Sequence, residues 1–325
     1  MSGAAASPAR HIGLIINPQA GKASGKGTAL AAKLARDHNI SIRTLQRFGD
    51  LGQILDGLAR DGVTDLFISS GDGTIQEILT EIAERKMFRQ TPRLCLLPHG
   101  TTNLSANDIG FRGRSTEAEA AFIRNPAASG TAIRHTIRCA NPGDGKARHG
   151  MFVGTGAVAE ATRYCQQAFN QRGVRGQWAV ARTLLAALRK HLLGKPANDD
   201  ESRFDRPFAI TVDAGGQRLA EGPQLLQMST TLDKLALNAR PFWGGKTGPI
   251  RTTVLPYPVP SVLRWTIPVM YGAENRRAPA GAVSFCGERL EVSSKTVFVI
   301  DGEFFAPPRA PLLLETGPAF SFLTG

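Results

Sequence analysis

Thr-Asp-Leu-Phe-Ile-Ser-Ser-Gly-Asp-Gly-Thr-Ile-Gln-Glu, residues 64–77, is the stretch that decides the fold of the N-terminal half. An apolar run stops at two serines, a Gly71-Asp72-Gly73 turn follows, and Thr74 opens a segment with apolar residues at helical spacing. The stretch therefore predicts a buried strand, a tight turn and a helix. Unpaired N–H groups and a positive dipole end at a helix N-terminus suit a phosphate group. An ordinary turn capped by Asp72 is the alternative, because short glycine motifs match by chance.

The three residues of this turn have different chemical uses. Gly71 and Gly73 permit positive φ and let a ligand approach the backbone closely. Asp72 cannot attract a phosphate by charge, so a metal ion, a hydroxyl group or the loop itself is its expected partner.

Strands and helices alternate on both sides of this turn. Strands are expected over residues 12–16, 41–46, 66–68 and 93–97, and helices over 28–38 and 52–60. This order implies a parallel, doubly wound sheet that binds its ligand at the carboxyl ends of the strands. Three of these ends carry polar, glycine-containing turns, at residues 17–21, 70–74 and 100–103. Their convergence on one edge predicts a binding site more strongly than any single turn.

The sequence changes character after about residue 128. Short β-like runs separated by Gly and Pro predict a mainly antiparallel β domain; they cover 133–139, 208–212, 225–229, 252–255, 263–270, 289–292 and 297–300. We therefore expect an α/β domain over 1–128 and a β domain over 129–325.

One predicted helical segment, residues 161–197, interrupts the β domain and contains no acidic residue. Arg175, Arg182 and Arg189 lie roughly 90° from the centre of its apolar stripe. Arginine stems in that position can cover an apolar edge while their charged ends reach anionic headgroups. We expect this segment to bind an anionic membrane surface. The alternative is a stripe that packs on the protein's own core and leaves the arginines solvated.

Composition narrows the classes of function. The chain has 325 residues, 42% hydrophobic and 20% charged, which is typical of a globular protein. Its net charge of +12 favours polyanionic partners, either nucleic acid or anionic lipid. Aromatic residues make up only 7% and no nucleic-acid-reading motif is present, so we expect no nucleic-acid partner. Four scattered cysteines indicate reduced thiols, and no run reaches the ~18 apolar residues of a membrane span.

Four motifs together resemble the diacylglycerol kinase catalytic domain superfamily, which includes bacterial lipid kinases and sphingosine and ceramide kinases. That family carries Asn-Pro-x-x-Gly, Gly-Gly-Asp-Gly-Thr-x-Asn-Glu, Pro-x-Gly-Thr-x-Asn and, late in the chain, Asp-Gly-Glu. This sequence matches the pattern in order and spacing with Asn17-Pro18-Gln19-Ala20-Gly21, Ser70-Gly71-Asp72-Gly73-Thr74-Ile75-Gln76-Glu77, Pro98-His99-Gly100-Thr101-Thr102-Asn103 and Asp301-Gly302-Glu303.

The resemblance implies a fold and a nucleotide site. The fold would be an α/β domain like that of NAD kinase and phosphofructokinase, followed by a lipid-binding β-sandwich, with ATP in the cleft between them. The positions that match the family's ATP contacts are Asn17, Pro18, Gly21, Thr44, Ser70, Gly71, Asp72, Gly73, Thr74, Gln76, Thr101 and Asn103. ATP and Mg²⁺ are the implied cofactors, and Asp72 is the one metal contact that we suggest, through Mg-ATP.

The resemblance also implies catalytic roles for Asp72, Asp301 and Glu303. Glu303 matches the proton acceptor of bacterial members, whereas in the sphingosine kinase branch that role falls to the position of Asp72. Either carboxylate could serve, because phosphoryl transfer needs positioning and charge neutralisation more than a strong base.

Departures from the family pattern bear on the lipid substrate. Ser70 replaces the first Gly of its turn, as in sphingosine kinases, and Gln76 replaces Asn. Residues 243–248 contain no carboxylate where bacterial diacylglycerol kinases have a metal loop. The expected acceptor is therefore ceramide or a sphingoid base, with diacylglycerol next.

We expect a cytoplasmic lipid kinase that associates peripherally with the inner membrane, and a homodimer remains open. Two alternatives stand beside it: a soluble-substrate kinase of the NAD kinase type, and a catalytically silent lipid-binding regulatory protein.

Overall fold

The computed structural model describes residues 10–21, 25–113, 115–126, 130–172, 206–259, 261–274 and 276–325. The chain divides into two compact units. The first comprises Met1–Gly100, Ile109–Ile133 and Phe320–Gly325, and the second comprises Thr101–Asp108 and Arg134–Ala319. The predicted domain boundary after residue 128 stays a prediction.

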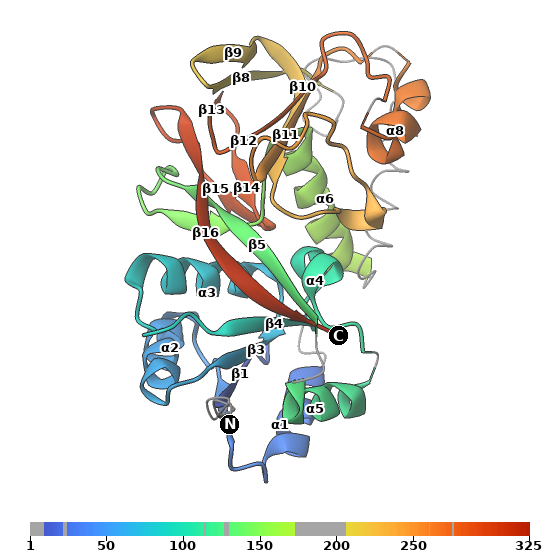
Figure 1. The fold of residues 1–325 in the computed structure, drawn as a ribbon. Helices are drawn as coiled ribbons and strands as arrows, with labels where there is room; N and C mark the ends of the chain where they lie inside the picture. Colours follow the sequence, from blue (N-terminus) through green and yellow to red (C-terminus); the bar gives the residue numbers. More distant parts are fainter. Residues whose placement is uncertain are drawn as a thin grey trace, which may run out of the picture. The chain divides into compact units, whose positions relative to one another are not determined.

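The first unit is built on a parallel sheet with the strand order β4-β3-β1-β2 (Figure 1). Its strands are β1 (Ile12–Ile16), β2 (Ile40–Thr44), β3 (Asp65–Ser70) and β4 (Arg93–Pro98). All three pairings are parallel. At the β4 edge, Phe322 of the last strand, β16 (Leu312–Thr324), pairs with Leu94.

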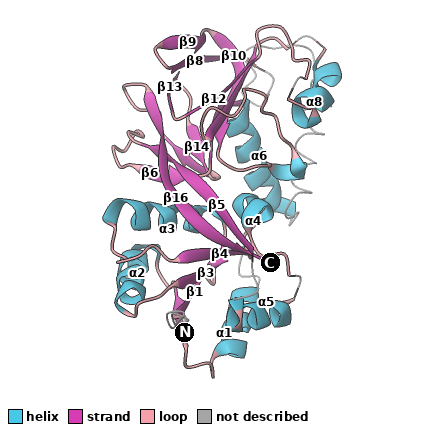
Figure 2. Cartoon of the chain, viewed as in Figure 1, coloured by secondary structure: helices cyan, strands magenta, loops and turns pink. Residues whose placement is uncertain are grey.

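Helices cover both faces of this sheet (Figure 2). Leu14 and Phe67 face a cluster that includes Leu30 of α1 (Lys26–Leu34) and Ile123 of α5 (Thr116–Arg124). The opposite face is covered by α2 (Leu51–Arg60) and α3 (Asp72–Arg85). Gly13 faces that side, since a Cβ there would lie 3.3 Å from Leu58 Cδ2. The predicted α/β fold of this unit is confirmed.

The second unit contains two antiparallel β-sheets. The first has the order β15-β14-β7-β10-β11-β12, and the second has the order β9-β8-β13-β16-β5-β6. They join where Pro223 and Gln224 of β10 pair with β8. Strand bounds are β5 (Gly130–Cys139), β6 (Arg148–Gly150), β7 (Phe152–Gly156), β8 (Phe208–Ala214), β9 (Gln217–Ala220), β10 (Pro223–Thr230), β11 (Ile250–Pro256), β12 (Val283–Gly287), β13 (Arg289–Ser294), β14 (Phe298–Ile300) and β15 (Glu303–Phe305).

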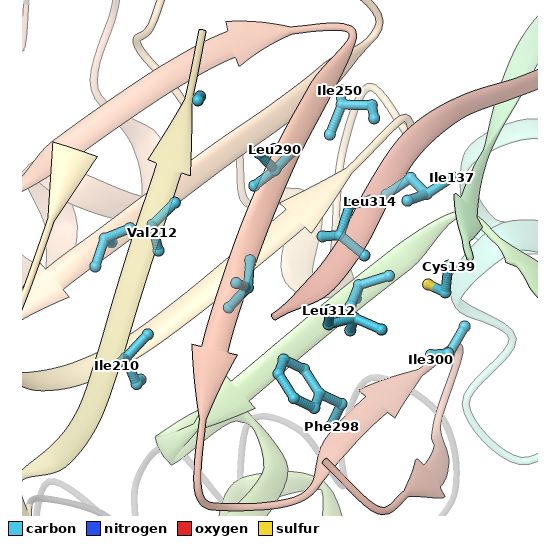
Figure 3. Close-up of a cluster of buried hydrophobic side chains, with 14 of the residues drawn as sticks. Ile137, Cys139, Ile210, Val212, Ile250, Leu290, Phe298, Ile300, Leu312 and Leu314 are labelled. Atoms are coloured by element: carbon cyan, nitrogen blue, oxygen red, sulfur yellow. The ribbon is translucent and has the colours of Figure 1, made fainter. Parts of the chain in front are cut away.

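Apolar side chains from both sheets form one buried cluster (Figure 3). Phe298 and Ile300 come from the first sheet, and Leu290, Leu312 and Leu314 come from the second. Because each sheet buries one face against the other, the unit is a β-sandwich. The predicted β-rich C-terminal region is confirmed.

The predicted strand over 263–270 is wrong, because these residues form α8 (Val262–Tyr271). Arg276 holds the end of this helix by donating to the carbonyl oxygens of Val269 and Arg240, and Arg240 N donates to Met270 O. These tertiary contacts satisfy carbonyl groups that a helix end leaves unpaired. An apolar run of this length does not by itself distinguish a buried strand from a helix.

Among the described residues, the remaining helical segments are α4 (Leu104–Ile109), α6 (Ala157–Arg172) and the 3₁₀ turns η1 (Phe48–Asp50) and η3 (Ala236–Asn238). All of them except α6 are short. Helix α6 covers the beginning of the predicted helix 161–197. The rest of that helix, with Arg175, Arg182 and Arg189, lies outside the described residues.

Candidate functional site

The carboxyl ends of the four parallel strands lie in one row. Ile16 at the end of β1 pairs with Thr44 on one side and with Ser69 on the other, and Ser70 pairs with Pro98. The turns that follow β1, β3 and β4 therefore leave the sheet at the same edge, as the sequence predicts. Thr44 is exposed at the end of β2.

Asn17 ties the first turn to the second. Its backbone N–H donates to Ser69 O (3.1 Å), and its side-chain Nδ2 donates to Thr74 Oγ1 (3.0 Å). The side-chain oxygen accepts from Gln19 N (2.9 Å), which closes a local Asx turn over Pro18. Asn17 and Thr74 thus engage each other's side chains and hold the two turns together.

The second turn is itself the beginning of α3. Gly71 is the N-cap, with φ −95° and ψ 173°, and the helix begins at Asp72, two residues earlier than predicted. The amides of Asp72, Gly73 and Thr74 lie in the first helical turn, where no intrahelical acceptor exists. These amides and the helix dipole can bind an anion.

Close backbone contacts explain two of the glycines. Gly21 has φ +57°, and a Cβ there would lie 2.6 Å from His99 O. A Cβ at Gly71 would lie 3.3 Å from Gly100 Cα. The first and second turns therefore both pack against the beginning of the third turn, which leaves no room for larger residues.

Two buried side chains, one in the second turn and one in the helix after it, differ in their hydrogen bonding. Ser70 is 1% exposed, and its Oγ has no hydrogen-bond partner among the described residues. A buried hydroxyl normally has a partner, so Ser70 departs from the common pattern. Gln76, in contrast, donates its side-chain amide to Thr80 Oγ1 (2.9 Å) within α3.

The third turn continues into the second unit. Residues Thr101–Asp108, with the predicted nucleotide contacts Thr101 and Asn103, belong to that unit. Asn103 has φ +53°, a conformation that Asn tolerates better than most residues, and its carbonyl accepts from Asn107 N (2.8 Å). The other predicted nucleotide contacts, at residues 17–76, belong to the first unit.

The Asp301-Gly302-Glu303 motif is a β-hairpin turn in the second unit. Ile300 pairs with Glu303, and Asp301 and Gly302 between them have φ +46° and +92°. A two-residue loop with two positive φ angles is the form that Asp-Gly favours. Glu303 is thus the first residue of the returning strand.

The two carboxylates of this motif have different surroundings. Asp301 is 3% exposed, and its Oδ1 accepts from Phe152 N (2.8 Å) and Met151 N (3.1 Å). Its carboxylate therefore holds the backbone that enters β7. Glu303 is exposed, and within the described residues no hydrogen bond or ion pair engages its side chain. Asp301 suits a positioning role, and Glu303 can receive a proton.

Sequence reasoning missed the residues of α6 that support this hairpin. Gln166 Nε2 donates to Gly302 O (2.8 Å), and the guanidinium carbon of Arg163 lies 5.6 Å from the centre of the Phe304 ring. No motif marks either residue, because the contacts join positions more than a hundred residues apart in the chain.

Cysteine chemistry and a protein-only metal site find no support in the described part of the chain. Burial raises the pKa of the Cys95 and Cys139 thiols well above their usual range, so both are protonated and unreactive. All four cysteines are free, and the described residues contain no cluster of three or more His, Cys, Asp or Glu side chains that could hold a metal ion.

Comparisons with known proteins agree with the motifs and the fold. Residues 11–141 match the family model of the diacylglycerol kinase catalytic domain. The structure resembles a candidate diacylglycerol kinase from Bacillus anthracis str. Sterne, with a TM-score of 0.67, 16% identity and 97% of each chain covered. A structure of a diacylglycerol kinase from the same organism gives a TM-score of 0.64, also at 16% identity and 97% coverage of each chain. No curated protein matches the chain.

Proposed function

Because residues 11–141 match the diacylglycerol kinase catalytic domain, we propose that this protein is a lipid kinase that transfers the γ-phosphate of ATP to a lipid hydroxyl. One observation supports the proposal: the first and third turns both lie against the turn that begins α3, and a helix N-terminus suits a phosphate. An exposed carboxylate, Glu303, follows the hairpin turn of the second unit.

The residues at the sheet edge fit a nucleotide. The first-turn amides of α3 suit its phosphates, Gly21 and Gly71 keep the backbone accessible, and the buried Ser70 hydroxyl needs a partner. Thr44, Thr101 and Asn103 are further contacts that we propose from the sequence. When bound, Mg-ATP supplies the phosphoryl group and a metal charge that offsets the negative charge of the phosphates. Asp72, in the first turn of α3, is the described carboxylate that we assign to that metal.

Glu303 is the proton acceptor in this proposal. Its carboxylate takes the proton of the lipid hydroxyl as the hydroxyl oxygen bonds to the γ-phosphorus, while the bond from that phosphorus to the β–γ bridging oxygen breaks and ADP leaves. Asp301 holds the hairpin turn that Glu303 follows. Asp72 is the alternative acceptor.

The proposed acceptor lipid is ceramide or a sphingoid base, with diacylglycerol as the second candidate. Ser70 in the second turn supports this order, as does the lack of a carboxylate in residues 243–248.

A lipid panel tests the function. Purified protein should transfer label from γ-³²P-ATP with Mg²⁺ to at least one of ceramide, sphingosine and diacylglycerol in mixed micelles. NAD and lipid-free micelles serve as parallel reactions. Label on NAD alone would indicate a kinase of the NAD kinase type. ATP binding without transfer to any acceptor would indicate a silent lipid-binding protein, and either result would contradict the proposal.

Reversible attachment to the inner face of the membrane is part of the proposal. No helix among the described residues is long and apolar enough to cross a membrane. Helix α8 nevertheless exposes Ile267 (64%) and Tyr271 (47%) one turn apart, with Arg264 exposed on the same side. Apolar and aromatic side chains beside a cation suit a bilayer interface. Arg175, Arg182 and Arg189 are the further contacts that we propose from the sequence.

Liposome co-sedimentation tests this attachment. Wild-type protein should pellet with vesicles that contain about 30% phosphatidylserine and pellet less with neutral vesicles, because polybasic surfaces gain about 1 kcal/mol per Lys or Arg near an anionic membrane. Charge reversal of Arg175, Arg182 and Arg189, or Ile267→Ser with Tyr271→Ser, should each reduce pelleting. Equal binding by all variants would refute the assigned surfaces. Lys246→Glu, at an exposed position paired with Glu274, is the control for a single charge change.

A further inference from the structure

A buried histidine lies directly behind the phosphate-binding turns. His99 Nδ1 lies 2.8 Å from Ser69 Oγ, and His99 Nε2 lies 2.9 Å from Glu119 Oε1. Ser69, His99 and Glu119 are 1%, 3% and 4% exposed. Ser69 lies near the end of β3, His99 directly follows β4, and Glu119 lies in helix α5. The histidine thus bridges three elements of the first unit in a water-excluded environment.

The order of these groups resembles a Ser-His-Glu hydrolase triad, but burial argues against that use. A nucleophilic hydroxyl must reach a substrate, whereas Ser69 Oγ is enclosed and a Cβ added at Gly27 would lie only 2.6 Å from it. The three side chains therefore hold structure in place and do not attack a substrate.

The tautomer of His99 sets which atom donates. With the proton on Nε2, the ring donates to Glu119 Oε1 and its Nδ1 accepts from the Ser69 hydroxyl. This chain of bonds orients the Ser69 side chain and the His99 ring together, and burial strengthens each bond relative to water.

Ser69 and His99 also contact all three turns through their backbones. Ser69 O accepts from Asn17 N (3.1 Å) in the first turn, and Ser69 is directly followed by Ser70 and Gly71 of the second. His99 O lies against Gly21, at the position that a Cβ would approach to 2.6 Å, and His99 leads directly into Gly100 of the third turn. A displacement of the imidazole ring would thus move every turn of the proposed site.

We propose that His99 is the positioning residue of the nucleotide site, with Glu119 and Ser69 as its two supports. This inference rests on the proposed function only in that the turns bind a nucleotide, and it does not depend on the acceptor lipid. Its readout is therefore nucleotide affinity, which needs no lipid.

Isothermal titration with Mg-ATP and Mg-ADP, and the melting temperature by calorimetry, should be measured on the full chain. In His99→Leu the Kd for nucleotide should rise about tenfold, which is about 1.4 kcal/mol. His99→Asn, whose amide oxygen can replace Nδ1 as the acceptor for Ser69, should bring the Kd back to within about threefold of wild type. Ser69→Ala removes the hydroxyl and keeps the carbonyl, and should weaken binding in the same direction if His99→Leu does not fold.

His149→Leu is the matched control. His149 is also a buried histidine held by a hydroxyl, with Thr136 Oγ1 2.9 Å from Nδ1, but it belongs to the second unit. It should lower the melting temperature and leave the Kd unchanged. Unchanged Kd in folded His99→Leu or Ser69→Ala would overturn the positioning role alone. A wild-type protein that binds no nucleotide would overturn the proposed function and the positioning role together.

Discussion

Glu303→Gln should lower turnover by about 10²- to 10⁴-fold, the range expected for loss of a general base, and leave the protein folded. Glutamine keeps the shape of the side chain but cannot take a proton at neutral pH. Glu303 is exposed and its side chain has no described hydrogen bond or ion pair, so the substitution should change the free energy of unfolding little. The measurement is kcat with the best lipid of the panel, together with nucleotide Kd and melting temperature, both of which should match wild type.

Two comparisons make this result specific. Glu288→Gln changes another exposed glutamate of the same unit, before β13, and should leave kcat unchanged. Asp72→Asn tests the alternative acceptor. It should lower turnover through loss of the metal contact, and turnover should depend less on the Mg²⁺ concentration. If Asp72→Asn abolishes turnover while Glu303→Gln retains the wild-type rate, Asp72 takes the proton and the assignment of Glu303 is refuted.

Asp301→Ala should destabilise the protein by about 2–4 kcal/mol, the cost of leaving one buried and one partly buried amide without their charged acceptor. Met151 N and Phe152 N donate to the Asp301 carboxylate, which is 3% exposed. Alanine also tolerates a φ of +46° poorly, which adds about 1 kcal/mol of strain. Urea unfolding followed by circular dichroism measures the loss.

A graded series separates the carboxylate from the backbone at this position. Asp301→Gly keeps the positive φ accessible and removes the acceptor, whereas Asp301→Asn keeps one acceptor oxygen and tolerates the same φ. The expected order of stability is wild type, then Asn, then Gly, then Ala. Turnover should fall in all three variants, because Glu303 follows the same turn. Equal stability of wild type and the Gly variant would show that the carboxylate contributes nothing to the hairpin.

Local sequence was sufficient for the N-terminal strands and for the turns that follow them. The buried strand before Ser70, the glycines of the second turn and the helix after it all follow from residues adjacent in the chain. Parallel pairing then requires the strand ends to meet at one edge. The helix begins at Asp72, two residues earlier than expected. The sequence pattern could not predict this start, because Asp and Gly both occur in turns and in first helical turns.

Residues 263–270 show where local pattern fails. Their apolar run fits a strand as well as a helix, and the contacts that hold the end of α8 come from Arg276 and from Arg240, about 30 residues before the helix end. Helical structure here depends on packing and on capping by distant groups more than on propensity.

The sequence by itself determined the set of motifs, the order of strands and helices in the first unit and the sheet edge at which the strand-end turns meet. These features depend on interactions between near neighbours and on the geometry of parallel strands. Only the tertiary structure decided that the Asp301 carboxylate accepts hydrogen bonds from the amides of residues 151 and 152, and that His99 joins Ser69 to Glu119. Each of these is a buried polar group whose hydrogen-bond partner is distant in the sequence. Folding brings the two groups together, so no local sequence pattern could predict the contact.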